Sequence, residues 1–219
     1  MKCFIFDLDG TLLDTEKLYR KYWPMALKDF GYELSDERAL MLRSLGRPFA
    51  PEQFKKWYGE SFDYSAVRNR RKEYVASHIA EHGIELRPGV CKLLDYLETN
   101  HIRRAIATAT DLERTTSYLK MVGLDGRFEE IVCATMVEHG KPAPDIYKYA
   151  VDKLDCADDI SEVYAVEDAP NGVLSAFRAG LKVIYVPDQT PSDEELKKYI
   201  YREVKSLDQI IDLVETHDL

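Results

Sequence analysis

From residue 88 to residue 188 the chain alternates between short apolar runs and longer amphipathic stretches. The apolar runs predict strands over 104–108, 130–133, 162–166 and 182–186. The amphipathic stretches predict helices over 90–100, 112–122, 144–154 and 171–179, and Pro144 suits the first position of the third helix. Repeated strand and helix units with apolar strands are typical of a parallel sheet covered on both faces. This part therefore predicts an α/β fold with a Rossmann-like core.

The segment between residues 15 and 83 lacks this alternation and predicts helices alone. One helical face collects the apolar residues Leu18, Tyr22, Met25, Ala26 and Phe30. Gly31 is expected to end this helix, a second begins near residue 35, and Pro48 and Pro51 are expected to break the next segment. A last helix over 67–79 would carry on its polar side Arg68, Arg70, Arg71 and Lys72. We predict a helical cap, residues 15–83, inserted after the first strand of a core formed by residues 1–14 and 84–219.

Length and composition restrict the class of protein. The 219 residues, with 45% hydrophobic content, suffice for one domain carrying a smaller insertion. The first apolar run ends at Asp7, too early for a signal peptide, and no stretch approaches the roughly 18 apolar residues of a membrane span. We expect a cytoplasmic monomer without membrane contact. The four scattered cysteines, expected to be buried reduced thiols, are Cys3, Cys91, Cys133 and Cys156.

The charge is distributed unevenly along the chain. A net charge of −9 argues against a general nucleic-acid binder. Residues 15–83 nevertheless contain 13 basic against 10 acidic side chains, whereas the remainder contains 17 against 29. A basic segment in an acidic protein suggests an anionic ligand where the two parts meet. Taken one at a time, most of these charged residues are explained equally well as solvent-exposed positions on helix surfaces.

Two carboxylates end the first apolar run. Asp7 and Asp9 are two residues apart, so in an extended chain they project to the same side, and two close carboxylates favour a hard cation such as Mg2+. A simple turn at a strand end, where Asp and Gly are common, explains the local pattern equally well. Other polar residues directly follow later strands, and in parallel sheets ligands bind beyond the carboxyl ends of the strands. The residues at these later strand ends are Thr108, Thr110, Glu167 and Asp168.

These residue types fit phosphoryl transfer. Asp7 would be the nucleophile that forms an aspartyl-phosphate, and Asp9 would be the general acid and then the base. Asp168 with Glu167 would complete the oxygen ligands of Mg2+. The phosphate would be held by the hydroxyl of Thr108, neighbouring backbone N–H groups such as that of Ala109, and the ammonium of Lys141. Each of these residues alone also suits a structural role; their joint placement favours a site.

Four segments resemble the ordered motifs of the haloacid dehalogenase superfamily. They are Asp7-Leu8-Asp9-Gly10-Thr11, Ala107-Thr108, Gly140-Lys141-Pro142 and Val166-Glu167-Asp168-Ala169-Pro170-Asn171-Gly172. The helical insertion, opening with Leu13-Asp14-Thr15-Glu16, resembles the cap of the phosphatase and phosphosugar mutase branch. The resemblance implies Mg2+ dependence, main-chain ligation of the metal by Asp9, and a cap that closes over a phosphorylated metabolite.

Several activities remain open within and outside this superfamily. A dehalogenase is disfavoured by Asp9 and Asp168, and a receiver-like signalling domain is disfavoured by the long insertion. A β-phosphoglucomutase-like isomerase is the main rival to a phosphatase. Such mutases resemble this chain in cap and motifs, but they have a histidine where this chain has Tyr19 and often a valine where it has Thr11. Both departures favour a phosphatase.

We expect residues of the cap to determine which substrate binds. The predicted substrate is a small phosphorylated metabolite, more specifically a sugar phosphate. Arg47 and Lys72 resemble substrate-contacting cap residues of the mutase-like branch, and Arg43 is a further candidate. Solvated helix faces explain each of them at least as well. Four aromatic residues of the cap could either form an apolar wall against a bound sugar or pack in the core of the cap. They are Tyr19, Trp23, Trp57 and Tyr58. We expect Trp23 in the core and leave Tyr19 open.

Overall fold

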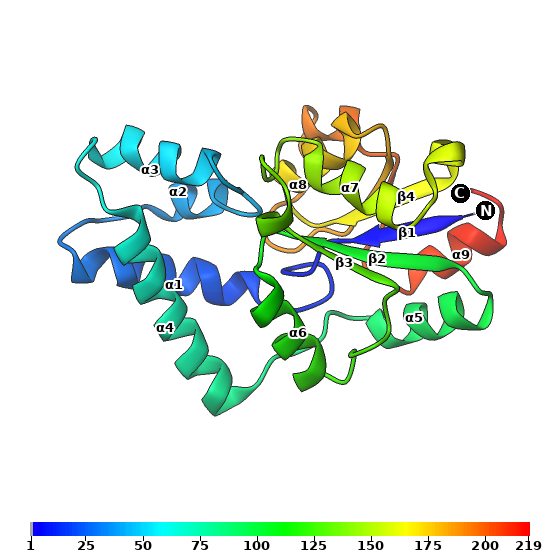
Figure 1. Ribbon diagram of the computed structural model, residues 1–219, viewed down its shortest axis with the longest axis horizontal. Helices are drawn as coiled ribbons and strands as arrows, with labels where there is room; N and C mark the ends of the chain where they lie inside the picture. Colours follow the sequence, from blue (N-terminus) through cyan, green and yellow to red (C-terminus); the bar gives the residue numbers. More distant parts are fainter. Residues whose placement is uncertain (1) are drawn as a thin grey trace.

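The computed structural model describes residues 2–219 and contains a parallel six-stranded sheet (Figure 1). The strand order is β3-β2-β1-β4-β5-β6, and every neighbouring pair is parallel. The strands are β1 (Cys3–Phe6), β2 (Arg103–Thr108), β3 (Glu130–Cys133), β4 (Val163–Glu167), β5 (Lys182–Tyr185) and β6 (Arg202–Glu203). The α/β Rossmann-like fold predicted from the sequence is confirmed.

Helices cover both faces of the sheet (Figure 1). Phe4 and Phe6 of β1 pack on the side of α5 (Val90–Thr99), α6 (Leu112–Met121) and α9 (Gln209–Glu215). Cys3 and Ile5 point to the other face, where α7 (Asp145–Lys153) and α8 (Pro170–Arg178) pack. This alternation follows from the two-residue period of a strand, and it leaves β1 buried on both faces.

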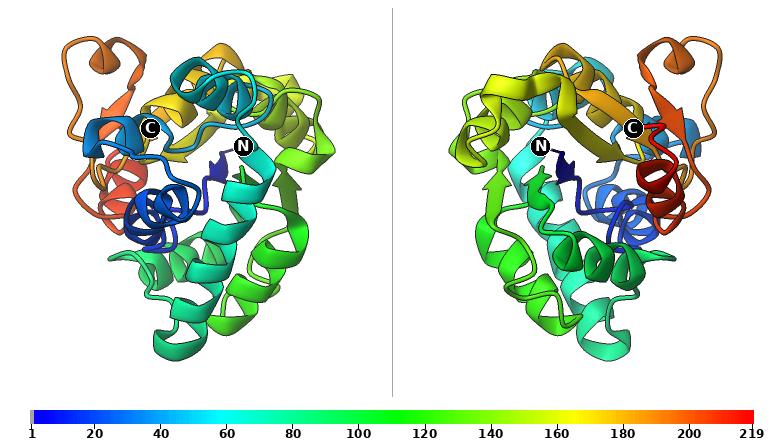
Figure 2. Two further views of the ribbon diagram at one scale, coloured as in Figure 1. Left: turned by 90° about the vertical axis from the view of Figure 1, so that its left-hand side faces the viewer. Right: turned by 90° about the vertical axis from the view of Figure 1, so that its right-hand side faces the viewer.

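Four helices lie beyond one end of the sheet and are called the cap helices below (Figure 1). They are α1 (Glu16–Asp29), α2 (Asp36–Met41), α3 (Phe49–Tyr58) and α4 (Tyr64–His82). Trp23 and Phe54 lie in their shared apolar cluster with ring centroids 4.8 Å apart, as expected for a core position of Trp23. The left view of Figure 2 faces the cap helices, with the two edges of the sheet, green and orange, on opposite sides. The exact cap bounds, 15–83, remain a prediction.

Two predictions about the cap helices were wrong. Pro51 does not break its segment but lies in the first turn of α3, where backbone N–H groups have no intrahelical partner and proline is tolerated. Arg71 does not lie on the polar side of α4. It is buried in the same stripe as Val67, Val75 and Ile79.

Smaller differences concern the core. Cys91 is exposed and Cys156 half-buried, so only Cys3 and Cys133 are the buried thiols that were expected. Pro144 immediately precedes α7 instead of occupying its first position. The pattern did not predict β6, α9 or the 3-10 helices η1 (Ala134–Met136), η2 (Ala157–Glu162) and η3 (Leu196–Tyr199).

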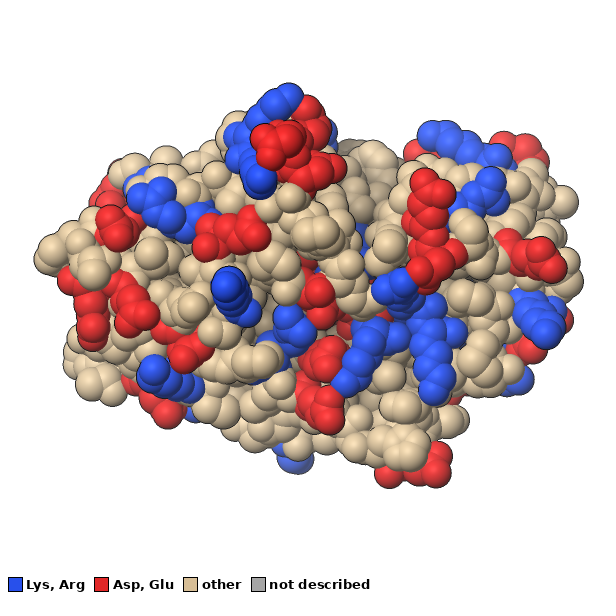
Figure 3. Space-filling view, turned by 180° about the vertical axis from the view of Figure 1, so that it is seen from behind, with Lys and Arg blue, Asp and Glu red and all other residues tan. Residues whose placement is uncertain are grey.

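The surface carries charges of both signs. Figure 3 shows acidic side chains interspersed among the basic ones on the face it views, including beside the group of Lys and Arg near its middle. That face therefore has no continuous basic surface of the kind nucleic-acid binders use. Within residues 2–219, no helix combines the length and the apolar character needed to cross a membrane.

Candidate active site

The carboxyl ends of β1 and β4 bring three acids together. The two strands are neighbours, and the N–H of Asp7 donates to the carbonyl of Val166 at 2.9 Å, which extends their pairing to the strand ends. Asp7, Glu167 and Asp168 each offer a carboxylate oxygen within 4.8 Å of the others, and all three side chains are buried. These three acids therefore form a compact, buried cluster at this edge of the sheet.

Lys141 bridges two acids of this cluster, Asp7 and Glu167. Its Nζ donates to Asp7 Oδ1 at 2.5 Å and to Glu167 Oε1 at 2.6 Å, and its side chain is fully buried. Tyr147 of α7 donates to the same Glu167 oxygen at 2.5 Å. Burial disfavours the ammonium form, but the adjacent carboxylates outweigh it and hold the pKa of Lys141 above its ordinary value. Lys141 is therefore a fixed positive charge beside Asp7.

The remaining oxygens of the cluster fit a divalent cation. Asp7 Oδ2 and Glu167 Oε2 are buried and have no hydrogen-bond partner. Burial raises the pKa of Asp7 well above its ordinary range and that of Asp168 to about 7, with nearby carboxylates adding to both shifts. Buried, unpaired carboxylate oxygens are the ligands that Mg2+ takes, and its charge would offset their mutual repulsion. The residues present therefore fit Mg2+.

Two glycines permit the close approach of chain segments around the acids. Gly10 has a φ of +93°, and a Cβ there would lie 2.4 Å from Asp168 Oδ2. A Cβ on Gly172 at the start of α8 would lie 2.1 Å from the carboxylate of Glu167. Thr11, directly after Gly10, donates to Asp168 Oδ1 at 3.2 Å. These contacts fix the carboxylates at the strand ends.

The carboxylate of Asp9 accepts three hydroxyl hydrogen bonds. Thr15 and Tyr19, at the start of α1, donate to Oδ1 at 2.6 and 2.9 Å, and Thr110 donates to Oδ2 at 2.6 Å. The hydroxyl of Tyr19 thus reaches an acid of the core, although the ring also lines the cavity described below. Thr15 was not predicted to take part, and a hydroxyl four residues beyond the first motif is too common a signal to have indicated it.

The second motif follows β2. Thr108 is fully buried, and its Oγ1 accepts a hydrogen bond from the backbone N–H of Thr110 at 3.0 Å. Ala109 and Thr110 line the cavity, whereas Thr108 lies behind them. The turn therefore lies beside Asp9, to which the Thr110 hydroxyl donates, and Thr108 holds the shape of this turn.

Arg43 joins the cap helices to the acid cluster. It is buried just after α2 and donates through Nη2 to the carboxylate of Asp168. Its Nε lies 3.8 Å from Glu16, a buried carboxylate whose pKa burial raises well above the ordinary range. Asn171, at the start of α8, donates to the carbonyl of Arg43 at 2.8 Å. The sequence had suggested Arg43 only as a substrate contact, and Glu16 not at all.

Main-chain atoms also join the cap helices to the core. The N–H of Gly46 donates to the carbonyl of Lys141 at 2.8 Å, and the N–H of Gly140 donates to the carbonyl of Arg47 at 2.7 Å. A Cβ on Gly46 would lie 2.7 Å from the Cα of Gly140. Only glycine allows the two loops to approach so closely.

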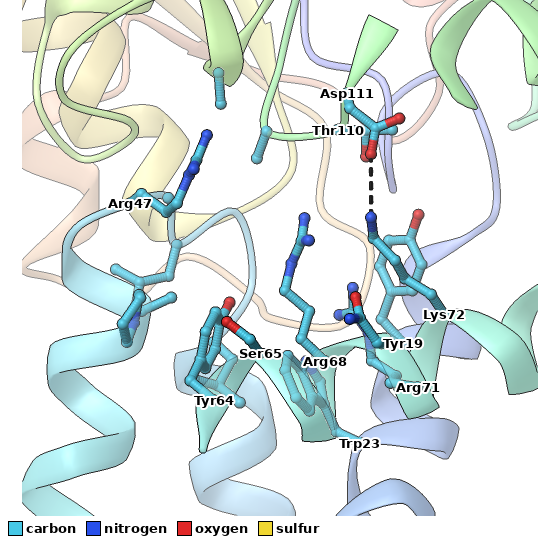
Figure 4. Close-up of a pocket in the computed structure, with 18 of the residues that line it drawn as sticks. Tyr19, Trp23, Arg47, Tyr64, Ser65, Arg68, Arg71, Lys72, Thr110 and Asp111 are labelled. Atoms are coloured by element: carbon cyan, nitrogen blue, oxygen red, sulfur yellow. Dashed lines mark hydrogen bonds and ion pairs between the residues drawn. The ribbon is translucent and has the colours of Figure 1, made fainter. Parts of the chain in front are cut away.

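A cavity of about 830 Å³ lies between the cap helices and the strand ends (Figure 4). Asp7 and Asp9 line one end of it. Arg47 extends into it from the loop before α3, and Lys72 reaches from α4 to Asp111, with 3.4 Å between Nζ and Oδ2 (Figure 4). Both predicted cap residues therefore face the cavity. Trp57 and Tyr58 do not line it and pack against the apolar cluster of the cap helices.

Comparison with known proteins agrees with this geometry. A family model of haloacid dehalogenase-like hydrolases matches residues 4–186. The chain belongs to this family. It is 34% identical over 214 residues to hexitol phosphatase A of Escherichia coli (strain K12), covering 96% of this chain and 94% of that protein. It is 28% identical over 190 residues to a phosphorylated carbohydrates phosphatase of Thermotoga maritima, covering 84% of each.

A solved structure is similar to this chain over nearly its whole length. It is a mutant of CbbY from Rhodobacter sphaeroides in complex with xylulose-(1,5)bisphosphate, with a TM-score of 0.80, 28% identity, and coverage of 95% of this chain and 96% of that chain. The protein is thus an enzyme of a hydrolase family whose relatives here are named phosphatases.

Proposed function

We propose that the protein is a Mg2+-dependent phosphatase that hydrolyses a small phosphorylated metabolite, a sugar phosphate, through an aspartyl-phosphate on Asp7. One observation carries the proposal: Lys141 bridges Asp7 and Glu167, and one buried oxygen of each carboxylate has no hydrogen-bond partner. The substrate class is supported by two relatives named for hexitol and phosphorylated carbohydrate.

In the first half-reaction, a carboxylate oxygen of Asp7 attacks phosphorus. The bond from phosphorus to the ester oxygen breaks, and Asp9 in its protonated form gives its proton to the departing oxygen, which leaves as an alcohol. Lys141 holds Asp7 in place through its 2.5 Å hydrogen bond and offsets the negative charge of the approaching phosphate.

In the second half-reaction, water attacks the phosphorus of the aspartyl-phosphate. Asp9, now a carboxylate, takes a proton from this water while the bond from phosphorus to Asp7 breaks, so inorganic phosphate leaves and both acids are restored. The hydroxyls of Thr15, Tyr19 and Thr110 hold the Asp9 carboxylate in one orientation for both proton transfers.

The metal and phosphate ligands are assigned on the same basis. Asp7, Glu167 and Asp168, with the main chain of Asp9, would hold Mg2+, which would orient the phosphate and offset repulsion between two anions. The phosphate oxygens would meet Lys141 and the backbone N–H of Ala109, in the turn after β2 that the hydrogen bond from the N–H of Thr110 to Thr108 Oγ1 stabilises. Arg47 and Lys72, which line the cavity, would contact the rest of the substrate, and the ring of Tyr19 would form part of its wall.

The test is phosphate release from a panel of sugar phosphates and nucleotides, with Mg2+ and with EDTA. We expect release from some sugar phosphates in Mg2+ and none in EDTA. Absence of release from every compound in Mg2+ would refute the phosphatase. The mutase alternative is tested in parallel: conversion of β-glucose 1-phosphate to glucose 6-phosphate without matching free phosphate would reassign the protein as an isomerase.

A further inference from the structure

Arg71 of α4 is a buried cation without an anionic partner. The buried cations among residues 2–219 are Arg43, Arg71, Arg104 and Lys141, and the other three each pair with a carboxylate. Arg71 is 8% exposed and has neither an ion pair nor a hydrogen bond within the described chain, and its Nε is fully enclosed. An unpaired buried charge is costly, and burial accordingly lowers the pKa of Arg71. A charge kept under these conditions points to a missing partner.

At this position of α4, an apolar side chain would avoid the cost of burying an unpaired charge. Val67, Val75 and Ile79 share its buried stripe at intervals of four residues. An apolar side chain at residue 71 would complete the stripe and remove the unpaired charge. Residues that lower stability without serving the packing are typical of functional sites.

Two aromatic rings hold the Arg71 guanidinium at the wall of the cavity (Figure 4). Its Cζ lies 4.6 Å from the ring centroid of Tyr19 and 4.3 Å from that of Trp23. The hydroxyl of the same Tyr19 donates to Asp9. One tyrosine side chain therefore contacts both the guanidinium and the group assigned as acid and base, so both lie within reach of a ligand the size of a five- or six-carbon sugar.

The surroundings of Arg71 are also positive. Arg68 and Lys72 project from the same face of α4 into the cavity (Figure 4), and Arg114 of α6 lines it too. Asp111 pairs with Lys72 and, at 3.0 Å, with Arg114. Arg68, like Arg71, has no ion pair within residues 2–219. Basic side chains therefore outnumber acidic ones around Arg71.

Resting on the proposed function, we infer that Arg71 and Arg68 form a second anion subsite, and that the substrate is a sugar-sized phosphate ester carrying a second anionic group, a carboxylate or another phosphate. The first phosphate meets Asp7 and Lys141, and the second anion meets the two guanidinium groups. Guanidinium groups suit both kinds of anion because their planar N–H donors match carboxylate and phosphate oxygens.

Binding to an Asp7→Asn variant tests the subsite without turnover. Calorimetry would compare 6-phosphogluconate with glucose 6-phosphate, and fructose 1,6-bisphosphate with fructose 6-phosphate, which separates a carboxylate from a phosphate as the second anion. We expect at least one doubly anionic probe to bind about tenfold more tightly than its partner, the difference that one charge-assisted contact supplies. Equal affinity within both pairs would overturn the inference.

Two further variants in the same background assign the effect to Arg71. Arg71→Met should abolish the difference within the pair. Arg70→Met is the matched control, because the Arg70 side chain is 43% exposed, does not line the cavity, and pairs with Asp29 and Glu73, so the difference should persist. The assignment would be overturned if the affinity difference survived in Arg71→Met, or if it were lost in Arg70→Met and kept in Arg71→Met.

A stability measurement separates this role from a structural one. In the otherwise unchanged protein without ligand, Arg71→Met should raise the Tm by about 2–4 °C, because it removes an unpaired buried charge. A lower Tm would show that Arg71 serves the packing, and the inference would fall. If the proposed phosphatase function itself is wrong, a separate result shows it: the wild-type protein releases no phosphate in Mg2+.

Discussion

The guanidinium of Arg43 and the carboxylate of Asp168 form a buried ion pair between the cap helices and the strand ends. Arg43 also lies 3.8 Å from both Glu16 and Asp188. One cation therefore serves three acids, of which Asp168 is a proposed metal ligand. Removing one partner of a buried pair leaves an uncompensated charge, so this contact links the position of the cap helices to the charge of the proposed metal site.

Arg43→Met should destabilise the metal-free protein strongly and increase its response to Mg2+. Loss of a buried partner costs roughly 3–5 kcal/mol in the free energy of unfolding. The cation would then meet Asp168 without a competing guanidinium. Thermal unfolding in EDTA and in Mg2+ measures both effects. Arg20→Met, which removes an exposed pair with Asp36, should change neither by more than about 1 kcal/mol. An equal response to Mg2+ in Arg43→Met and wild type would contradict the link.

Asp7→Asn should abolish phosphate release while the protein stays folded. An amide cannot act as the nucleophile, but it keeps the shape of the side chain. Release of phosphate and circular dichroism would be measured on the same preparation. Asp14→Asn, at a half-buried acid paired with exposed Lys17, serves as control and should keep its activity. Undiminished release by the Asp7 variant would exclude the nucleophile assignment.

Asp168→Ala should weaken Mg2+ binding at least tenfold. The change removes one of three carboxylates that lie within 4.8 Å of each other, and charged oxygen ligands dominate Mg2+ affinity. Calorimetric titration of EDTA-treated protein measures the affinity directly, independently of turnover. Asp145→Ala, at the start of α7, should leave it unchanged. Equal Mg2+ affinity of the Asp168 variant and wild type would exclude this metal site.

Tyr19→Phe should lower kcat about three- to tenfold with a small effect on stability. It removes one of three hydroxyl donors to Asp9, and a single hydrogen bond contributes roughly 0.5–1.5 kcal/mol. Steady-state kinetics on the best sugar phosphate would show the loss. Tyr22→Phe is the matched control, because that hydroxyl of the same helix contacts His78 instead. A kcat equal to that of wild type would mean that Thr15 and Thr110 suffice to position Asp9.

The sequence predicted the acid cluster because its geometry follows from topology. Parallel strands end at one edge, so Asp7 and Asp168 had to meet once β1 and β4 were neighbours. Arg71 was misplaced because its surroundings depend on how α1 packs on α4, which periodicity within one helix cannot reveal. The burial of Glu16 beside Arg43 likewise depends on a contact between segments distant in sequence.

The paired loops at Gly46 and Gly140 have a consequence for how such an enzyme can diversify. Their hydrogen bonds use main-chain atoms, and one of them accepts at the carbonyl of Lys141 itself. Exchanges of side chains along α4 leave these hydrogen bonds intact, so the cap helices keep their register against the loop of Lys141 while the cavity wall changes. New substrate preferences can then arise by single substitutions, without each one having to rebuild the alignment that hydrolysis needs.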